Sequence, residues 1–331
     1  MKVFVIGSGS WGTAVGNVLA DNGVETMIWG RNPQEVEDIS VNHRNSRFFE
    51  DTALNPELKA TTEFSRINEF DTVILAVPSH AVKATAVKIR NVLTRKIRLV
   101  NLAKGFDPET HIRLSEEVQQ ILNDRYLVCY AALLGPSHAE EVIKRMQTTI
   151  NIVCEDEEQA IILQKALSNE YFRVYRNDDM IGCEYAAGLK NIIAIASGIL
   201  YGLELGDNAK ASLMTRGLAE MSRYGLKKGA RPETFMGLCG MGDLIVTCTS
   251  VHSRNWQAGY QIGKADSAAE FWRTNTKTVE GINACRIIYE EAQREKIPMP
   301  ITAEVYQVLF ENKKPSEAML ELMTRQLKAE I

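Results

Sequence analysis

The sequence has few of the residues that build a metal centre or a disulfide framework. Its 331 residues include six cysteines and five histidines, and no two cysteines form a C-x-x-C pair. No nearby histidines complete a zinc pattern, and no Ser-His-Asp or Cys-His arrangement stands out. We therefore expect no bound metal, and we interpret the cysteines as reduced thiols of a cytoplasmic protein.

An excess of positive charge and a secretory signal are also missing. The net charge is -4, so electrostatics does not favour a nucleic-acid partner. The first residues, MKVFVIGSGS, contain an apolar run of only four residues that leads into glycines, so we expect no signal peptide there. One long apolar stretch has a lysine near its middle, which argues against a membrane span. Composition and length are those of an ordinary soluble protein with two domains.

The first half of the chain alternates short apolar runs with helical patterns. Buried strands are expected at Lys2–Ile6, Glu25–Trp29, Asp71–Val77, Ile97–Leu102, Leu127–Leu134, Thr149–Cys154 and Phe172–Tyr175. From about Asp178 the strand patterns end and helical patterns continue. The sequence therefore predicts an α/β N-terminal domain with a doubly wound (Rossmann) parallel sheet over residues 1–182. An all-α domain that holds substrate and catalytic groups is expected over residues 183–331.

The first expected strand leads into a G-x-G-x-x-G motif formed by Gly7, Gly9 and Gly12, and a helix and a second strand follow. The first glycine permits a tight turn, the second lets a pyrophosphate approach the backbone, and the third lets the helix pack on the strand. The helix N-terminus, at Ser10 and Trp11, presents N–H groups to the anion. We therefore predict that a dinucleotide binds at this turn.

The residue after the second strand indicates which dinucleotide binds. NAD sites usually place an Asp or Glu there for the ribose 2′-hydroxyl, but this chain continues from Trp29 to Gly30 and Arg31. Because a guanidinium suits a 2′-phosphate, NADP(H) is favoured and NAD(H) stays open. The alternative is that Arg31 is a solvated loop arginine.

The long apolar stretch, Cys183–Leu205, is the most informative segment of the second half. Its large apolar residues recur at helical spacing and predict one buried stripe, whereas Lys190 falls on another face. The neighbours of this lysine on its own face are small, namely Ala186, Ala187, Ala194 and Ser197. Desolvation would lower the pKa of the lysine and make it a proton carrier. Alternatively, it reaches the surface or pairs with a carboxylate, for which Asp243 is the candidate.

Several hydrogen-bond donors follow expected strands or turns and suggest a small anionic substrate. Lys104 and Ser137 come after the fourth and fifth expected strands, where ligands of parallel sheets bind. A serine, an arginine and an asparagine at 253–255 can donate to phosphate oxygens. Ser137 also begins a possible capping box with Glu140, which would give this serine a structural role at the start of a helix. Glycines 237, 240 and 242 break the chain before Asp243, which could orient Lys190 or a substrate hydroxyl.

Seven sequence blocks carry a resemblance to a known family. The blocks are GSGSWGTA (7–14), NLAKGF (101–106), GPSHAEEV (135–142), GLKNIIAIASGI (188–199), NAKASLMTRGLAEM (208–221), GLCGMGDLIVTCTS (237–250) and SRN (253–255). In this order they resemble the bacterial NAD(P)-dependent glycerol-3-phosphate dehydrogenases. The resemblance implies reversible oxidation of sn-glycerol 3-phosphate to dihydroxyacetone phosphate. It also implies supply of glycerol 3-phosphate for phospholipid synthesis in the cytoplasm, often by a homodimer.

The resemblance also implies roles for individual residues, with Lys190 as the general base. The substrate contacts that it implies are Lys104, Gly135, Ser137, Lys190, Asp243, Thr247, Ser253, Arg254 and Asn255. With the glycine motif and Arg31, the expected cofactor contacts are Gly7, Gly9, Ser10, Trp11, Gly12, Arg31, Lys104, Ala139, Arg254 and Glu280.

Two other classes of protein stay open. A dehydrogenase of 3-hydroxy acids can also carry a lysine on its central helix, although the S-R-N triplet favours a phosphorylated substrate. A non-enzymatic NADP-binding sensor would not need Lys190 in an apolar helix. An absorbance assay of the nicotinamide would distinguish such a sensor from an enzyme.

Overall fold

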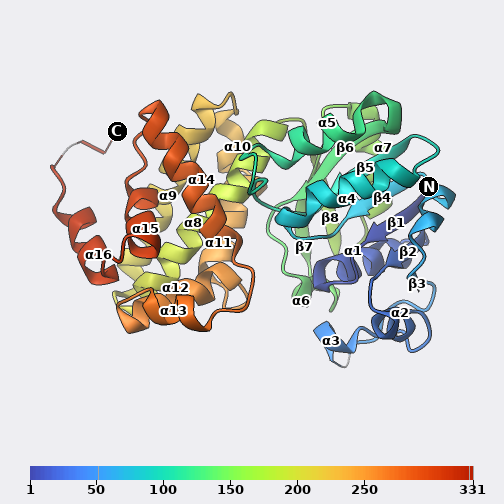
Figure 1. Ribbon diagram of the computed structural model, residues 1–331, viewed down its shortest axis with the longest axis horizontal. Helices are drawn as coiled ribbons and strands as arrows, with labels where there is room; N and C mark the ends of the chain where they lie inside the picture. The colour runs from blue at the N-terminus through green and yellow to red at the C-terminus, as the bar shows by residue number, and fades with distance from the viewer. Residues whose placement is uncertain (51, 328, 331) are drawn as a thin grey trace. The chain divides into compact units, whose positions relative to one another are not determined.

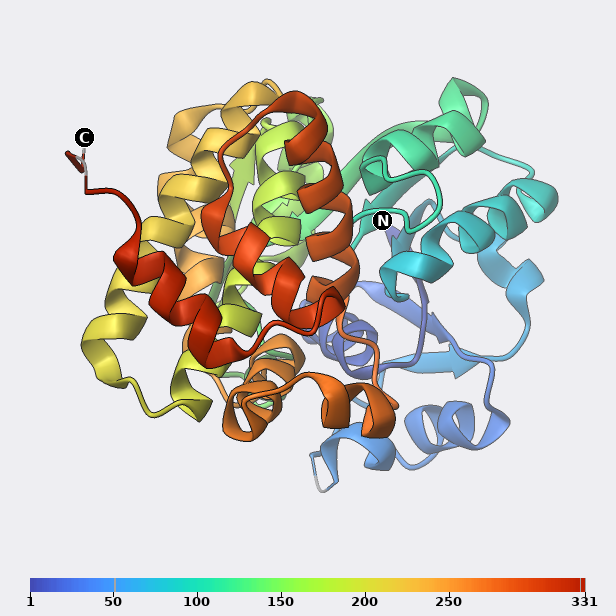
Figure 2. The same ribbon diagram turned by 60° about the vertical axis from the view of Figure 1, so that its left-hand side comes forward.

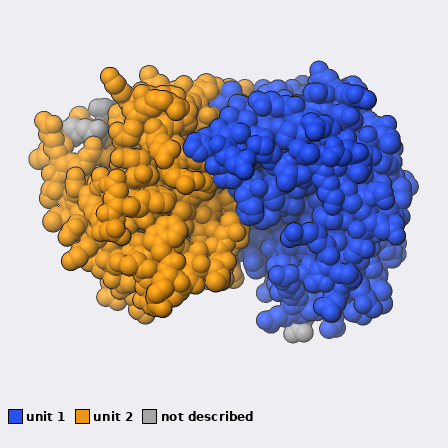
Figure 3. Space-filling model, in the orientation of Figure 1, with its two compact units in different colours: residues 1–184 blue, residues 185–331 orange. Residues whose placement is uncertain are grey.

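A computed structural model describes residues 1–50, 52–327 and 329–330 of the chain. The chain divides into two compact units, Met1–Glu184 and Tyr185–Ile331, which are coloured separately in Figure 3. Each unit is described by itself below.

The first unit is built on an eight-stranded sheet with the order β3-β2-β1-β4-β5-β6-β7-β8 (Figure 1). Its strands are β1 (Lys2–Ile6), β2 (Glu25–Trp29), β3 (Lys59–Thr61), β4 (Thr72–Leu75), β5 (Ile97–Asn101), β6 (Leu127–Leu134), β7 (Thr148–Val153) and β8 (Phe172–Asn177). Neighbouring strands are parallel except for β6 and β7, which are antiparallel. The expected doubly wound α/β fold is thereby confirmed, with one strand pair reversed and the short strand β3 added.

The helices of this unit connect the strands on both faces of the sheet. They are α1 (Ser10–Asp21), α2 (Pro33–Ser40), α3 (Ser46–Phe49), η1 (Phe64–Glu69), α4 (Ser79–Val92), α5 (Leu114–Tyr126), α6 (Ala139–Val142) and α7 (Glu157–Leu167). The chain runs from β1 outward to β2 and β3, returns to β4, and then proceeds the other way to β5 and β6. Because such crossovers are right-handed, α1 lies on one face and α4 and α5 lie on the other. The order reverses between β1 and β4, and ligands of open sheets bind at the carboxyl ends of strands at such a point.

The second unit is helical throughout its described residues. Its helices are α8 (Met180–Gly202), which begins in the first unit, α9 (Gly206–Lys227), α10 (Pro232–Met236), η2 (Leu238–Gly242), α11 (Asp243–Thr249), α12 (Arg254–Ala265), α13 (Ala269–Thr274), α14 (Glu280–Glu295), α15 (Pro300–Phe310) and α16 (Pro315–Thr324). Among the residues that the structure describes, no helix combines the length and apolar character needed to cross a membrane.

Helix α8 is the centre of the second unit, and Figure 2 shows it in yellow-green, enclosed by the orange and red helices. All residues from 186 to 200 are buried. The apolar residues expected in the buried stripe are buried up to Leu200, and the face that carries Lys190 is buried as well. Helix α12 approaches closely through glycines: a Cβ at Gly198 would lie 2.1 Å from the carbonyl oxygen of Trp256, and one at Gly259 would lie 2.0 Å from that of Ile195.

The first turns of α8 are anchored to the start of α5 by a buried carboxylate, Glu184. It accepts hydrogen bonds from the backbone N–H of Ser115 at 2.9 Å, from the Ser115 hydroxyl, and from Arg113 Nη1 at 3.1 Å. Burial raises the pKa of Glu184, and the contacts with Ser115 and Arg113 oppose this rise. These contacts fix the N-terminal part of α8, and Lys190 lies further along the same helix.

Candidate active site

The turn between β1 and α1 leaves space for a ligand at one of its three glycines. Gly7 has φ 122°, in the left-handed region that suits glycine. A Cβ at Gly12 would lie 2.2 Å from the carbonyl oxygen of Gly7, so this glycine is needed for packing within the chain. At Gly9, in contrast, no atom of the described residues lies within 4 Å of the Cβ position, and none of their side chains caps α1. The open space and the uncapped N–H groups at Ser10 and Trp11 fit a pyrophosphate.

Two positive charges meet at the carboxyl end of β2. Arg31 is exposed in the bend that follows this strand. Lys88 comes from α4, and its Nζ lies 4.2 Å from the ring centre of Trp29 and 4.0 Å from that of Phe64. Burial lowers the pKa of Lys88, and the nearby charge of Arg31 lowers it further. The sequence analysis missed Lys88, because only the fold brings α4 to the end of β2.

A carboxylate also reaches the glycine turn, from a position that the sequence motif does not include. Glu35 on α2 accepts a hydrogen bond from the Ser8 hydroxyl at 2.7 Å and pairs with Arg47. Burial opposes the charge of Glu35, but the hydrogen bonds from Ser8 and Arg47 hold its pKa below the usual range. The Glu35 carboxylate near the glycine turn is therefore already engaged by Ser8 and Arg47.

The loops after β5 and β6 bring three predicted substrate residues together. Lys104 Nζ donates to the carbonyl oxygen of Gly135 at 3.0 Å, and the Ser137 hydroxyl donates to the same oxygen at 3.1 Å. The expected capping box was wrong: α6 begins at Ala139 after His138 and has no side-chain cap, because the Ser137 hydroxyl turns back to Gly135. The hydrogen bond that the Ser137 hydroxyl donates is therefore local to this loop.

Lys190 is buried in the second unit, and Asp243 and Thr247 are polar partners of its ammonium. Its side chain is 4% exposed, so it does not reach the surface. Its Nζ lies 2.6 Å from Asp243 Oδ1 and 2.6 Å from Thr247 Oγ1. The Thr247 hydroxyl donates to the backbone oxygen of Asp243, so it accepts from Lys190. The pairing of Lys190 with Asp243 that the sequence suggested is thus present, with Thr247 as a second partner.

The glycine-rich segment before Asp243 interrupts the helical run at Gly237, as expected, but it is helical at Gly240 and Gly242. Residues 238–242 form one π-helical turn, η2, which continues directly into α11. A Cβ at Gly240 would lie 2.2 Å from the backbone oxygen of Phe235, so the glycine allows this turn to pack on α10. The close packing sets where α11 begins and so places Asp243 in its first turn.

Cys248 lies on α11 close to this ion pair, but it is a poor candidate for a nucleophile. Burial raises the pKa of the Cys248 thiol to about 12, because the positive charge of Lys190 only partly offsets the burial. The thiol is therefore protonated at neutral pH. The backbone oxygen of Cys248 accepts from the Ser197 hydroxyl at 2.8 Å, which ties α11 to α8.

Asn255 joins three helices, which the sequence did not reveal. Its Nδ2 donates to Asn191 Oδ1 on α8 at 2.9 Å, and its Oδ1 accepts from the backbone N–H of Gly281 on α14 at 2.9 Å. A Cβ at Gly281 would lie 2.6 Å from the backbone oxygen of Asn191. Because an amide nitrogen carries two hydrogens, the bond to Asn191 uses only one hydrogen of Asn255 Nδ2. In the sequence, the polar residue Asn191 next to Lys190 in the apolar stretch was a signal of this arrangement.

The other predicted residues of the second unit lie at helix N-termini. The Ser253 hydroxyl caps α12 by accepting from the backbone N–H of Trp256 at 3.2 Å. Arg254 is exposed in the first turn of α12 and lines a cavity of about 270 Å³, together with Lys277 and others. Glu280 is the first residue of α14. A guanidinium at the N-terminus of a 12-residue helix is a favourable place for a phosphate.

Family models match both halves of the chain. Residues 2–160 match the model described as NAD-dependent glycerol-3-phosphate dehydrogenase N-terminus. Residues 179–320 match the one described as NAD-dependent glycerol-3-phosphate dehydrogenase C-terminus.

Whole-length relatives agree with the family models. The chain is 42% identical over 330 residues to a protein named glycerol-3-phosphate dehydrogenase [NAD(P)+] from Streptococcus agalactiae, covering 99% of this chain and 98% of the relative. A protein of the same name from Exiguobacterium is 44% identical over 331 residues, covering 100% of this chain and 97% of the relative. The crystal structure of glycerol-3-phosphate dehydrogenase from Coxiella burnetii is similar with a TM-score of 0.90 and 33% identity, covering 98% of this chain and 99% of that one. The chain belongs to the family of NAD-dependent glycerol-3-phosphate dehydrogenases.

Proposed function

We propose that this protein interconverts sn-glycerol 3-phosphate and dihydroxyacetone phosphate with NADP(H) or NAD(H). The observation that carries the proposal is the buried group formed by Lys190, Asp243 and Thr247, in a chain of this family. The proposed domains are residues 1–182 for the dinucleotide and residues 183–331 for the substrate and the proton carrier. We further propose that the enzyme acts in the cytoplasm, as a homodimer, and supplies glycerol 3-phosphate for phospholipid synthesis.

Lys190 moves the proton of the reaction. A reduced dinucleotide whose pyrophosphate is held at the glycine turn would supply the hydride that C2 of dihydroxyacetone phosphate receives. The ammonium of Lys190 then gives a proton to the C2 oxygen as that oxygen gains negative charge. In the opposite direction, neutral Lys190 takes the proton of the C2 hydroxyl. Asp243 and Thr247 hold Nζ in one place, each at 2.6 Å.

The substrate phosphate binds at the start of α12. Arg254 supplies a charge-assisted contact, and the remaining amide hydrogen of Asn255 and the helix N-terminus add donors. From the family resemblance we also propose Lys104, Gly135, Ser137 and Ser253 as substrate contacts. Ala139, Lys104, Arg254 and Glu280 are proposed as cofactor contacts, alongside the glycine turn and Arg31.

Initial rates with purified protein test the substrate. NADPH oxidation should be rapid with dihydroxyacetone phosphate and slow with an unphosphorylated 3-oxo acid, because the phosphate donors would be left unpaired. A higher kcat/KM for the 3-oxo acid would assign the protein to the other dehydrogenase class. If NADPH binds but is oxidised with neither compound, the sensor hypothesis is favoured.

Two alanine substitutions in the glycine turn should separate cofactor binding from folding. Gly9→Ala places a methyl in open space, so thermal stability should change little while NADPH affinity falls. Gly12→Ala places a methyl 2.2 Å from a carbonyl oxygen, so the melting temperature itself should fall. Thermal melts and NADPH titrations measure both. Normal NADPH affinity in Gly9→Ala would mean that the pyrophosphate of the cofactor does not lie close to this glycine.

Arg31→Asp should shift the cofactor preference. Losing a charge-assisted contact with the 2′-phosphate should raise KM for NADPH about tenfold, and KM for NADH should change much less. Arg95→Asp is the matched control, since Arg95 is also exposed in a loop but lies before β5. Equal changes of KM for the two cofactors would show that Arg31 does not contact the 2′-phosphate.

A further inference from the structure

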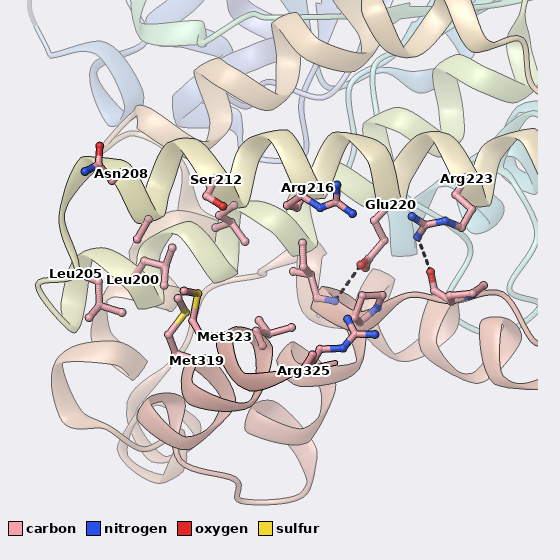
Figure 4. Close-up of a pocket in the computed structure, with 16 residues that line it drawn as sticks. Leu200, Leu205, Asn208, Ser212, Arg216, Glu220, Arg223, Met319, Met323 and Arg325 are labelled. Carbon is pink, nitrogen blue, oxygen red and sulfur yellow. Dashed lines mark hydrogen bonds between the residues drawn. The ribbon is translucent and has the colours of Figure 1, made fainter. Parts of the chain in front are cut away.

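The second unit contains a groove that includes none of the site residues assigned above (Figure 4). It has a volume of about 580 Å³, within the range of about 300–1,000 Å³ that is common for small-molecule sites. Figure 4 shows apolar side chains at one end of the groove and arginines at the other. The apolar end includes Leu200, Leu205, Met319 and Met323, and the cationic end has Arg216, Arg223 and Arg325 around Glu220.

The apolar end keeps large side chains in contact with water. Leu205 is 42% exposed and Met323 is 69% exposed. A ligand that covers them gains the hydrophobic free energy of the area removed from water. Methionines are flexible enough to adapt to a chain of variable shape. This end therefore suits an alkyl chain, and it does not suit glycerol 3-phosphate, which is polar throughout.

The cationic end carries more positive than negative charge. The Glu220 carboxylate is already satisfied, because it accepts hydrogen bonds from the backbone N–H groups of Ile301 and Thr302 and from the Thr302 hydroxyl at the start of α15. Among the described residues, Arg216 forms a long ion pair with the exposed carboxylate of Glu330, at 3.8 Å. A phosphate or carboxylate can displace so weak a contact.

Two further guanidiniums complete this end of the groove. Arg223 donates a hydrogen bond to the carbonyl oxygen of Pro298 at 2.7 Å. Because this acceptor is neutral, the bond does not neutralise the positive charge of the arginine. Arg325, just after α16, is exposed. Guanidinium groups match the geometry of phosphate and carboxylate oxygens.

We propose that the groove binds an anionic amphiphile with a single alkyl chain. The chain lies on the leucines and methionines, and a phosphate or carboxylate head group contacts Arg216 and Arg325. Fatty acids and monoalkyl phosphates share this chemistry. The proposal concerns a second site and does not depend on the reaction proposed above. A further copy of the protein is the competing occupant, but the concave shape and the charge at one end favour a small ligand.

Calorimetric titration of the full-length protein tests the proposal. Dodecyl phosphate and dodecanoate are the probes, used below their micelle concentrations, and they compare the two head groups. Inorganic phosphate tests the charge alone, and dodecyl maltoside tests the chain alone. We expect at least one of the two amphiphiles to bind saturably, one per chain, and at least about tenfold more tightly than either control compound. No saturable binding of either amphiphile would overturn the proposal.

Matched variants locate the site. Met323→Asp puts a negative charge into the apolar end, and Leu320→Asp makes the same change on α16 at a similarly exposed residue that does not line the groove. Arg216→Ala removes a head-group contact, and Arg286→Ala is its exposed control on α14. We expect about a tenfold loss of amphiphile affinity in Met323→Asp and Arg216→Ala, and less than about twofold in the controls.

Two outcomes of the variant series would overturn the proposal. One is an equal loss of affinity in a control variant, which would show that binding is not in the groove. The other is dissociation of an oligomer by Met323→Asp in sedimentation, with amphiphile binding unchanged, which would identify the groove as a contact between copies of the chain.

Discussion

Replacing Lys190 with methionine should lower turnover by about 10²–10⁴-fold, the usual contribution of general acid–base catalysis. Methionine keeps the length and the apolar stem of the side chain but carries no proton. NADPH binding should persist, because the glycine turn belongs to a different unit of the chain. Steady-state kinetics and an NADPH titration measure the two properties.

A structural effect of this substitution must be separated from the catalytic one. Removing one partner of a buried ion pair leaves Asp243 uncompensated, which typically costs about 3–5 kcal/mol of stability. The double variant Lys190→Met/Asp243→Asn removes both charges, so it should regain much of the melting temperature while turnover stays low. If the folded double variant turned over at a rate close to that of the unmodified enzyme, Lys190 would be structural, and Lys104 would be the next candidate for the base.

Arg254→Ala should give the second large effect, a loss of kcat/KM with dihydroxyacetone phosphate. A hydrogen bond with a charged group is worth about 1.5–3 kcal/mol, or roughly 10- to 150-fold. The effect should be much smaller with unphosphorylated dihydroxyacetone, which lacks the group that the guanidinium would contact.

The phosphate assignment has its own control. Arg286→Ala removes an exposed arginine from α14 and should leave both substrates unaffected. An equal loss on both substrates in Arg254→Ala would contradict a phosphate contact. Such a result would instead point to the additional cofactor contact that the family resemblance implies for this arginine.

The fold could be predicted from the sequence because its main elements have local signals. Buried parallel strands appear as continuous apolar runs, and the glycine turn follows the first of them. Strand β3 was missed because it has three residues, of which only Thr61 is buried. The antiparallel direction of β7 was missed because an apolar run has the same pattern in either direction.

The candidate site was predictable only in part. The isolated charge in an apolar segment singled out Lys190, and Asp243, which follows the glycine-rich segment, was its candidate partner. Thr247 came from the family resemblance, and its contact with Lys190 depends on the helical continuity of η2 and α11. The contacts of Lys88 at the end of β2 and of Glu35 at the glycine turn depend on how α4 and α2 pack, which no local pattern records.

One measurement tests the proposed reaction most directly. The purified enzyme is incubated with dihydroxyacetone phosphate and NADPH that is doubly deuterated at C4 of the nicotinamide, and the product is analysed by NMR and mass spectrometry. We predict sn-glycerol 3-phosphate with one deuterium, located at C2, because hydride goes to that carbon while Lys190 protonates the oxygen. Absence of deuterated product, or deuterium at another carbon, would contradict the proposed reaction.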